Sequence, residues 1–119
     1  MPEDLYCKIY VDAPIGKEAL KQALLEISGG HLVALTVTTD IFELSVFRTR
    51  PGALGGLDDF LRWPYYLEIE PVSDGTDEEA YLSALASLIR ALLAKGFGAV
   101  PSCGFEDQLH SRVGNRLRE

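Results

Sequence analysis

Residues 63–71 read WPYYLEIEP, and this stretch sets the expected architecture. Apolar and polar side chains alternate along it, which is the period of a β-strand with one buried face. A second acidic segment, CGFEDQL, occupies residues 103–109. Between the two, residues 76–95 carry the apolar spacing of an amphipathic helix, and Gly96 is a good helix stop. The sequence therefore predicts a strand, a helix and a second strand that ends in an acidic turn.

The preceding residues extend this pattern into an α+β domain. Alternating apolar positions predict strands at residues 5–11, 33–37 and 42–46, and a helical stripe runs over residues 19–27. With the last strand at residues 99–103, the predicted order is β-α-β-β-β-α-β. Neither helix can bury its apolar stripe alone, so we expect two helices on one face of a mainly antiparallel sheet. The expected fold is a ferredoxin-like sandwich variant.

At 119 residues the chain is long enough for one domain but not for two. We expect a single α+β domain over residues 1–109 and a flexible basic tail over residues 110–119. The tail holds three of the eleven Lys and Arg residues. An alternative is that it forms a basic arm that contacts nucleic acid.

The charge balance restricts the partners. The formal net charge is −7, which disfavours binding to a phosphate backbone and favours association with a basic protein. The acidic start and the absence of a long apolar run predict no signal peptide and no membrane span. We therefore expect a cytoplasmic protein that binds neither nucleic acid nor membrane.

No catalytic, cofactor or metal constellation is recognisable. His31 and His110 have no assignable partner, and their spacing from the two cysteines does not fit a zinc site. Cys7 and Cys103 are expected to be reduced, buried and apolar in character, and a disulfide would require their strands to be neighbours. The sequence predicts a protein that is not an enzyme and needs no cofactor.

One sheet face combines tyrosines with carboxylates, including Tyr66, Glu68 and Glu70. Aromatic residues dominate binding hot spots, so this face is a candidate surface for a protein partner. The alternative is a solvated face with cross-strand aromatic pairs. Acidic pairs in predicted turns add further candidates. The predicted partner-binding residues are Asp58, Asp59, Tyr66, Glu68, Glu70, Glu106 and Asp107.

The run FLRWPYYLEIE at residues 60–70, the capped helix and the CGFEDQL segment carry a family resemblance. Over residues 5–109 the chain resembles the immunity proteins of bacterial polymorphic and contact-dependent growth inhibition toxin systems. The resemblance implies a non-enzymatic inhibitor that binds one cognate toxin C-terminal domain, often a basic nuclease, and covers its active site. Two alternatives stay open: a small-molecule-binding regulatory domain of ferredoxin-like type, and a small enzyme that uses Glu68, Glu70 or His31.

Overall fold

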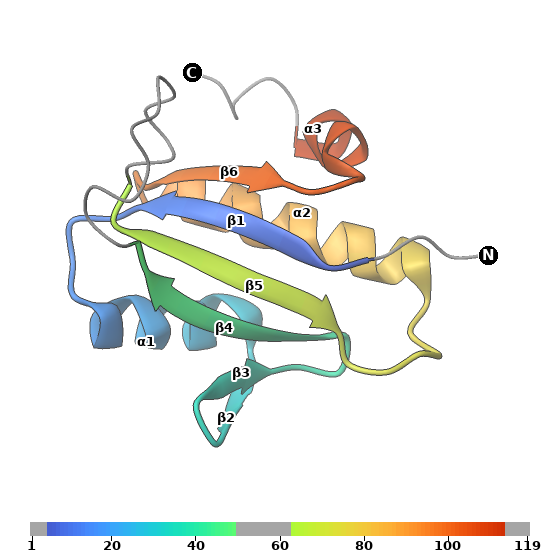
Figure 1. Ribbon diagram of the computed structural model, residues 1–119, viewed down its shortest axis with the longest axis horizontal. Helices are drawn as coiled ribbons and strands as arrows, with labels where there is room; N and C mark the ends of the chain where they lie inside the picture. Colours follow the sequence, from blue (N-terminus) through green and yellow to red (C-terminus); the bar gives the residue numbers. More distant parts are fainter. Residues whose placement is uncertain (1–4, 50–62, 114–119) are drawn as a thin grey trace.

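The computed structural model describes residues 5–49 and 63–113. Within them the chain forms one antiparallel sheet and three helices, so the protein is α+β (Figure 1). In chain order the elements are β1 (Cys7–Asp12), α1 (Lys17–Ser28), β2 (His31–Val33), β3 (Thr36–Thr38), β4 (Phe42–Arg48), β5 (Tyr65–Pro71), α2 (Glu78–Ala94), β6 (Gly98–Ser102) and α3 (Glu106–Val113).

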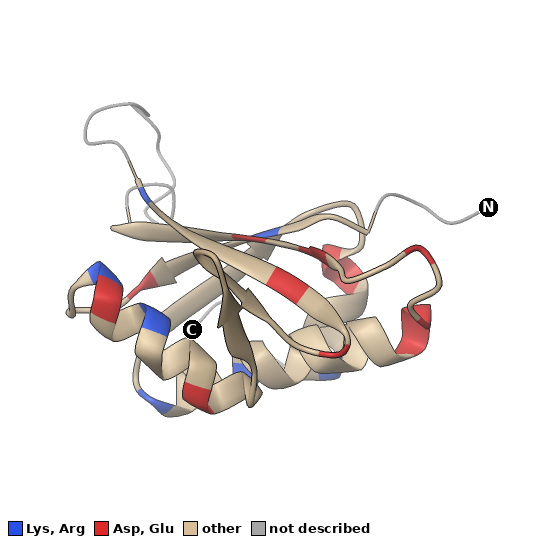
Figure 2. Ribbon diagram, turned by 90° about the horizontal axis from the view of Figure 1, so that it is seen from below, with Lys and Arg blue, Asp and Glu red and all other residues tan. Residues whose placement is uncertain are grey.

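The six strands lie in the order β2-β3-β4-β5-β1-β6, and every neighbouring pair is antiparallel. Helices α1 and α2 lie side by side beneath the same face of the sheet (Figures 1 and 2). The antiparallel sheet and the shared helix face confirm the coarse prediction. The predicted two-helix, ferredoxin-like order is incomplete, because the structure adds one strand and a third helix.

The additional strand arises because the predicted strand at residues 33–37 is a hairpin. β2 and β3 pair through a two-residue turn at Ala34 and Leu35, and Ala34 adopts a positive φ of 58°. Such turns usually contain glycine, asparagine or aspartate, and neither residue here belongs to that set. Leu35 is consequently 77% exposed at the hairpin tip instead of lying in the core.

The predicted basic tail is wrong from residue 110 to residue 113. These residues belong to α3, which packs against α2 and β6 and buries Leu109 and Val113. Arg112 anchors the helix, because its guanidinium donates to both carboxylate oxygens of Glu79 at 2.7 and 2.8 Å. This ion pair lowers the pKa of Glu79. Residues 114–119 lie outside the described part of the chain.

The core lies between the sheet and the helices. Alternate residues of the central strands point toward α1 and α2, and Ile9, Leu67 and Ile69 are fully buried there. Tyr81 of α2 is also fully buried, and its hydroxyl donates to the Leu5 carbonyl at 2.7 Å and the Ile69 carbonyl at 3.2 Å. The period-2 prediction for these strands is confirmed, and the remaining alternate positions form the opposite face of the sheet.

Candidate functional site

The candidate site is the face of the sheet turned away from α1 and α2, called the outer face below. The strand registers decide which side chains are neighbours there, because directly opposite residues of antiparallel strands share one face. Three of the predicted residues, Tyr66, Glu68 and Glu70, lie on this face along β5. The outer face also carries Lys8, Tyr10, Glu43, Ser45 and Phe47.

Aromatic rings gather at one end of the outer face. The Tyr66 ring stacks on Phe47, with centroids 5.3 Å apart and 20° between the planes. Tyr10 lies on the other side of Tyr66 at 6.3 Å in a tilted arrangement. Phe47 stays 37% exposed, so this cluster offers apolar and aromatic area to solvent. The strand pattern predicted tyrosines on this face, including Tyr66, but did not indicate Phe47.

The ammonium group of Lys8 lies over the rings of Tyr66 and Tyr10. Its ammonium lies 4.4 Å from the centroid of Tyr66 and 5.2 Å from that of Tyr10, both within the range of cation–π attraction. Its position in the register is directly opposite Glu68. The lysine therefore lies where the aromatic cluster borders the carboxylates.

The tryptophan reaches the same face from the start of β5. Gly98 of β6 pairs with Asp12 and so has its Cα on the outer face. A Cβ at Gly98 would lie 2.6 Å from the indole of Trp63. The absence of a side chain at Gly98 therefore lets the indole lie against the β6 backbone. Trp63 is the only tryptophan in the chain, which makes it a specific optical reporter for this face.

Carboxylates occupy the other end of the outer face. Glu43 of β4 and Glu70 of β5 are directly opposite each other, and both are exposed. Like charges at directly opposite positions destabilise a sheet. Glu68 lies opposite Ser45 on the same pair of strands. Figure 2 shows acidic positions on the strands as well as at the ends of the helices.

Glu68 interacts with Tyr6, which immediately precedes β1. Burial raises the pKa of Tyr6 to about 12, and the charge of Glu68 and its hydrogen bond with the phenol act in the same direction. The tyrosine thus stays protonated as a donor to Glu68. This contact fixes one carboxylate, whereas Glu43 and Glu70 remain exposed.

The other predicted residues do not join this face. Glu106 and Asp107 lie in the first turn of α3, where the sequence predicted an acidic turn. The Glu106 carboxylate accepts the backbone N–H of Cys103 at 3.2 Å, so it has a local capping role, whereas Asp107 is exposed. Asp58 and Asp59 lie outside the described residues.

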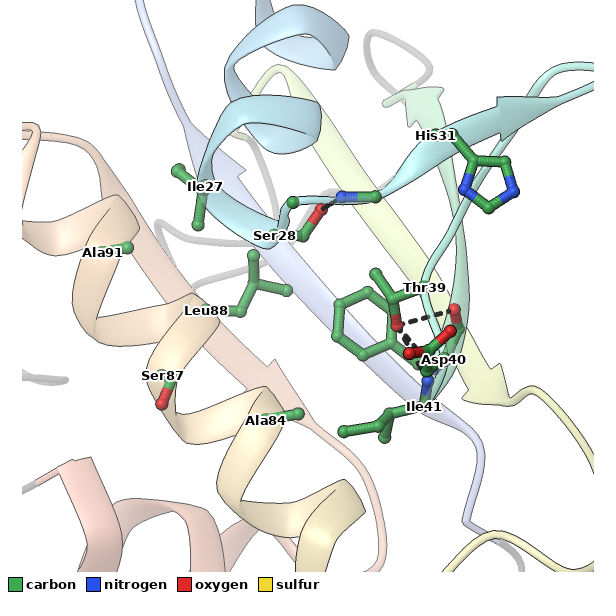
Figure 3. Close-up of a pocket in the computed structure, with 13 residues that line it drawn as sticks. Ile27, Ser28, His31, Thr39, Asp40, Ile41, Ala84, Ser87, Leu88 and Ala91 are labelled. Atoms are coloured by element: carbon green, nitrogen blue, oxygen red, sulfur yellow. Dashed lines mark hydrogen bonds between the residues drawn. The ribbon is translucent and has the colours of Figure 1, made fainter.

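A cavity of about 380 Å³ lies on the helix side of the sheet, between the end of α1, the β3–β4 turn and the middle of α2. Figure 3 shows apolar side chains of Ile27, Ile41 and Leu88 around it. Thr39 shapes the turn, since its hydroxyl accepts the backbone N–H groups of Ile41 and Phe42. This cavity was not predicted from the sequence. The sequence feature that corresponds to the cavity is a set of small residues on one side of α2, namely Ala84, Ser87 and Ala91.

The cavity has polar groups at its rim. Ser28, His31, Asp40 and Ser87 contribute to the lining, and both His31 and Asp40 are exposed. An apolar floor with a few polar groups is typical of small-molecule sites, and the volume lies within their usual range. The arrangement suits a compact ligand with an apolar body and a polar end.

Comparisons with protein-family models, with curated proteins and with solved structures found no match. Over residues 5–49 and 63–113, no group of three or more histidine, cysteine or carboxylate side chains is arranged to hold a metal ion. In the same ranges no helix has the length and apolar character needed to cross a membrane. The site therefore has to be interpreted from its own geometry.

Proposed function

We propose that this protein is a non-enzymatic inhibitor that uses its outer face to bind a basic protein partner. The observation that carries the proposal is the pairing of Glu43 with Glu70, two exposed carboxylates held directly opposite each other on the same sheet face as an aromatic cluster. At directly opposite positions of a sheet, like charges are subject to repulsion. A lysine or arginine of a partner placed between them would relieve it and gain two charge-assisted hydrogen bonds.

The aromatic cluster supplies the other half of such an interface. Tyr66 and Phe47 are stacked and partly exposed, so they can bury apolar area against a partner with little loss of side-chain freedom. The net charge of −7 adds long-range attraction for a basic surface and speeds association. The aromatic residues would provide affinity, and the carboxylates would select a cationic partner.

The resemblance of residues 5–109 to immunity proteins gives this partner a class. We propose the C-terminal domain of a cognate toxin, with a nuclease as the leading choice. A nuclease binds a polyanion through a basic surface. An acidic inhibitor that occupies this surface blocks access to the substrate without any chemistry of its own, in the cytoplasm of the cell that makes both proteins. In the same proposal the core β4-β5-β1-β6 with α1 and α2 is a ferredoxin-like sandwich, to which the hairpin and α3 are additions.

The test is co-purification with the toxin C-terminal domain encoded beside this protein, followed by titration. We expect a 1:1 complex that abolishes toxicity. The double variant Glu43→Lys/Glu70→Lys should weaken binding at least about tenfold, which corresponds to about 1.4 kcal/mol. The matched control is Glu18→Lys/Glu26→Lys, which makes the same change in net charge at exposed positions of α1. Equal weakening by both variants would mean that only net charge matters, and would refute the outer face as the interface.

Trp63 provides a second readout of the same complex. The indole lies against Gly98 at the border of the outer face, so a partner that covers this face should change its emission maximum or intensity. An emission spectrum that stays constant at saturating partner would place the contact elsewhere on the molecule.

The cavity supports a second candidate function, a small-molecule-binding regulatory domain. A ligand that fills it at a hundredfold excess over its dissociation constant would stabilise the fold by about 2.7 kcal/mol, which a thermal-shift screen detects. Ala84→Leu should abolish the shift by occupying the cavity, and Ala94→Leu at the exposed end of α2 is the control. If the ligand acts equally on both variants, it binds outside the cavity.

A further inference from the structure

Two free thiols meet at the other edge of the sheet, away from the hairpin. β1 and β6 pair with Lys8 opposite Ser102 and Ile9 opposite Pro101. One step further along this register, Cys7 is opposite Cys103, and their sulfur atoms are 3.1 Å apart. Both cysteines are unbridged. A disulfide needs a sulfur separation of about 2.05 Å, so a shift of about 1 Å would suffice to form the bond.

The two thiols differ in their access to solvent. Cys7 is fully buried in the core, whereas Cys103 is half-buried. Cys103 lines a cavity of about 410 Å³ together with Tyr6, Glu78, Phe105 and Gln108. A small reagent that enters this cavity reaches Cys103 first. Cys7 lies behind it, in position to react with whatever forms on the outer sulfur.

The two thiols also differ in how readily they ionise, and Cys103, the more accessible thiol, ionises more readily. The hydrogen bond between the sulfur atoms raises the pKa of Cys7 and lowers the pKa of Cys103, because the Cys7 thiol keeps its proton and donates a hydrogen bond to the Cys103 thiolate. Burial acts further against ionisation of Cys7. Thiolates are the attacking species in thiol–disulfide exchange, so Cys103 is the nucleophile and Cys7 is the second thiol, which resolves the adduct.

We propose that Cys103 and Cys7 form a dithiol redox site that reacts with small disulfides entering the Cys103 cavity. The Cys103 thiolate attacks one sulfur of the reagent, forming a mixed disulfide and releasing one thiolate. Cys7 then loses its proton and attacks the Cys103 sulfur, which forms the Cys7–Cys103 bond and releases the second thiol. Two protein thiols are oxidised and one reagent disulfide is reduced to two thiols.

The carboxylates near this cavity select the reagent by charge. Glu78 lines it, and the charge of Glu106 opposes ionisation of both cysteines. A cationic disulfide such as cystamine is therefore a better reagent than an anionic one. The product would link the start of β1 to the segment that enters α3. Neither cysteine belongs to the outer face, so the proposed reaction does not depend on the proposed partner interface.

The test uses the reduced full-length protein, cystamine and intact mass spectrometry. The wild type should lose two hydrogens, retain no cysteamine and yield a Cys7–Cys103 peptide on digestion. Cys7→Ser should stop at a single cysteamine adduct on Cys103. Cys103→Ser should react at least tenfold more slowly when folded, and as fast as Cys7→Ser in denaturant, which serves as the control for intrinsic thiol reactivity.

Two results would overturn the proposal. One is a wild type that keeps a cysteamine on each cysteine, because the thiols would then not meet. The other is equal rates for the two folded single variants, because access would then not distinguish the thiols. If a serine substitution impairs folding, Cys7→Ala and Cys103→Ala replace the serine variants. The formation of the Cys7–Cys103 bond in the wild type is measured independently of any variant.

Discussion

Leu109→Ala tests whether α3 is an integral part of the fold. Leu109 is fully buried in the core, on a helix that packs against α2 and β6. The substitution removes three carbon atoms, which corresponds to about 2.4 kcal/mol of transfer free energy at about 0.8 kcal/mol per methylene. A cavity that fails to collapse adds to this cost, and measured Leu→Ala substitutions in cores fall at about 2–5 kcal/mol. We expect a loss of about 3 kcal/mol in the free energy of unfolding.

Urea denaturation followed by circular dichroism measures this loss. With an m-value of about 1.5 kcal/mol/M, the midpoint should fall by about 2 M while m stays unchanged. Gln108→Ala is the matched control, because Gln108 is the exposed neighbour on the same helix and should change stability by less than about 0.5 kcal/mol. A loss below about 1 kcal/mol for Leu109→Ala would show that α3 is not packed as described, and would revive the flexible tail from residue 110.

Three further predictions concern hydroxyl, carboxylate and glycine positions. Tyr81→Phe should lower the free energy of unfolding by about 1–3 kcal/mol in a denaturation titration, because two backbone carbonyls lose their phenol donor; an unchanged midpoint would contradict these bonds. The pKa of Tyr6 is higher in the folded state than in the unfolded state, so protonated Tyr6 stabilises the fold. This stabilisation is complete below about pH 10 and is lost as the pH rises toward about 12. Glu68→Gln should move the Tyr6 transition in a spectrophotometric titration down toward the ordinary value, and an unmoved transition would refute the contact. Gly98→Ala should displace the indole of Trp63 and shift its fluorescence, whereas an identical spectrum would show that the ring does not lie against β6.

Local periodicity was sufficient for the elements that carry one clear apolar face. The inward-facing positions of β1, β4 and β5 are apolar at every second residue, and the stripes of α1 and α2 end at glycines or near them. These patterns depend on neighbours within a few positions in the chain, which is why the sequence predicted both helices, the antiparallel sheet and the residues facing outward on β5. β6 contains Pro101 and is the terminal strand of the sheet, a position in which a strand tolerates proline.

The elements missed by the sequence analysis have weak local patterns. The Ala34–Leu35 turn lacks the glycine, asparagine or aspartate that usually adopts the positive φ of such a turn, so the sequence pattern predicts one continuous strand through it. In α3 the buried positions are Leu109 and Val113, one helical turn apart, and two residues cannot define a stripe. Both elements exist because tertiary packing compensates for a poor local preference. The hairpin pairs with β4, and α3 covers α2.

The sequence alone was enough to place three residues of the candidate site on one face, whereas the pairings across that face follow from the tertiary structure. Tyr66, Glu68 and Glu70 share a face because a strand has a period of two, whatever lies beside it. Strand order and register determine three contacts that the sequence does not show: Glu43 opposite Glu70, Trp63 against Gly98, and Cys7 next to Cys103. Register is set by the burial of a whole sheet face against α1 and α2, a property that no short segment of the chain contains.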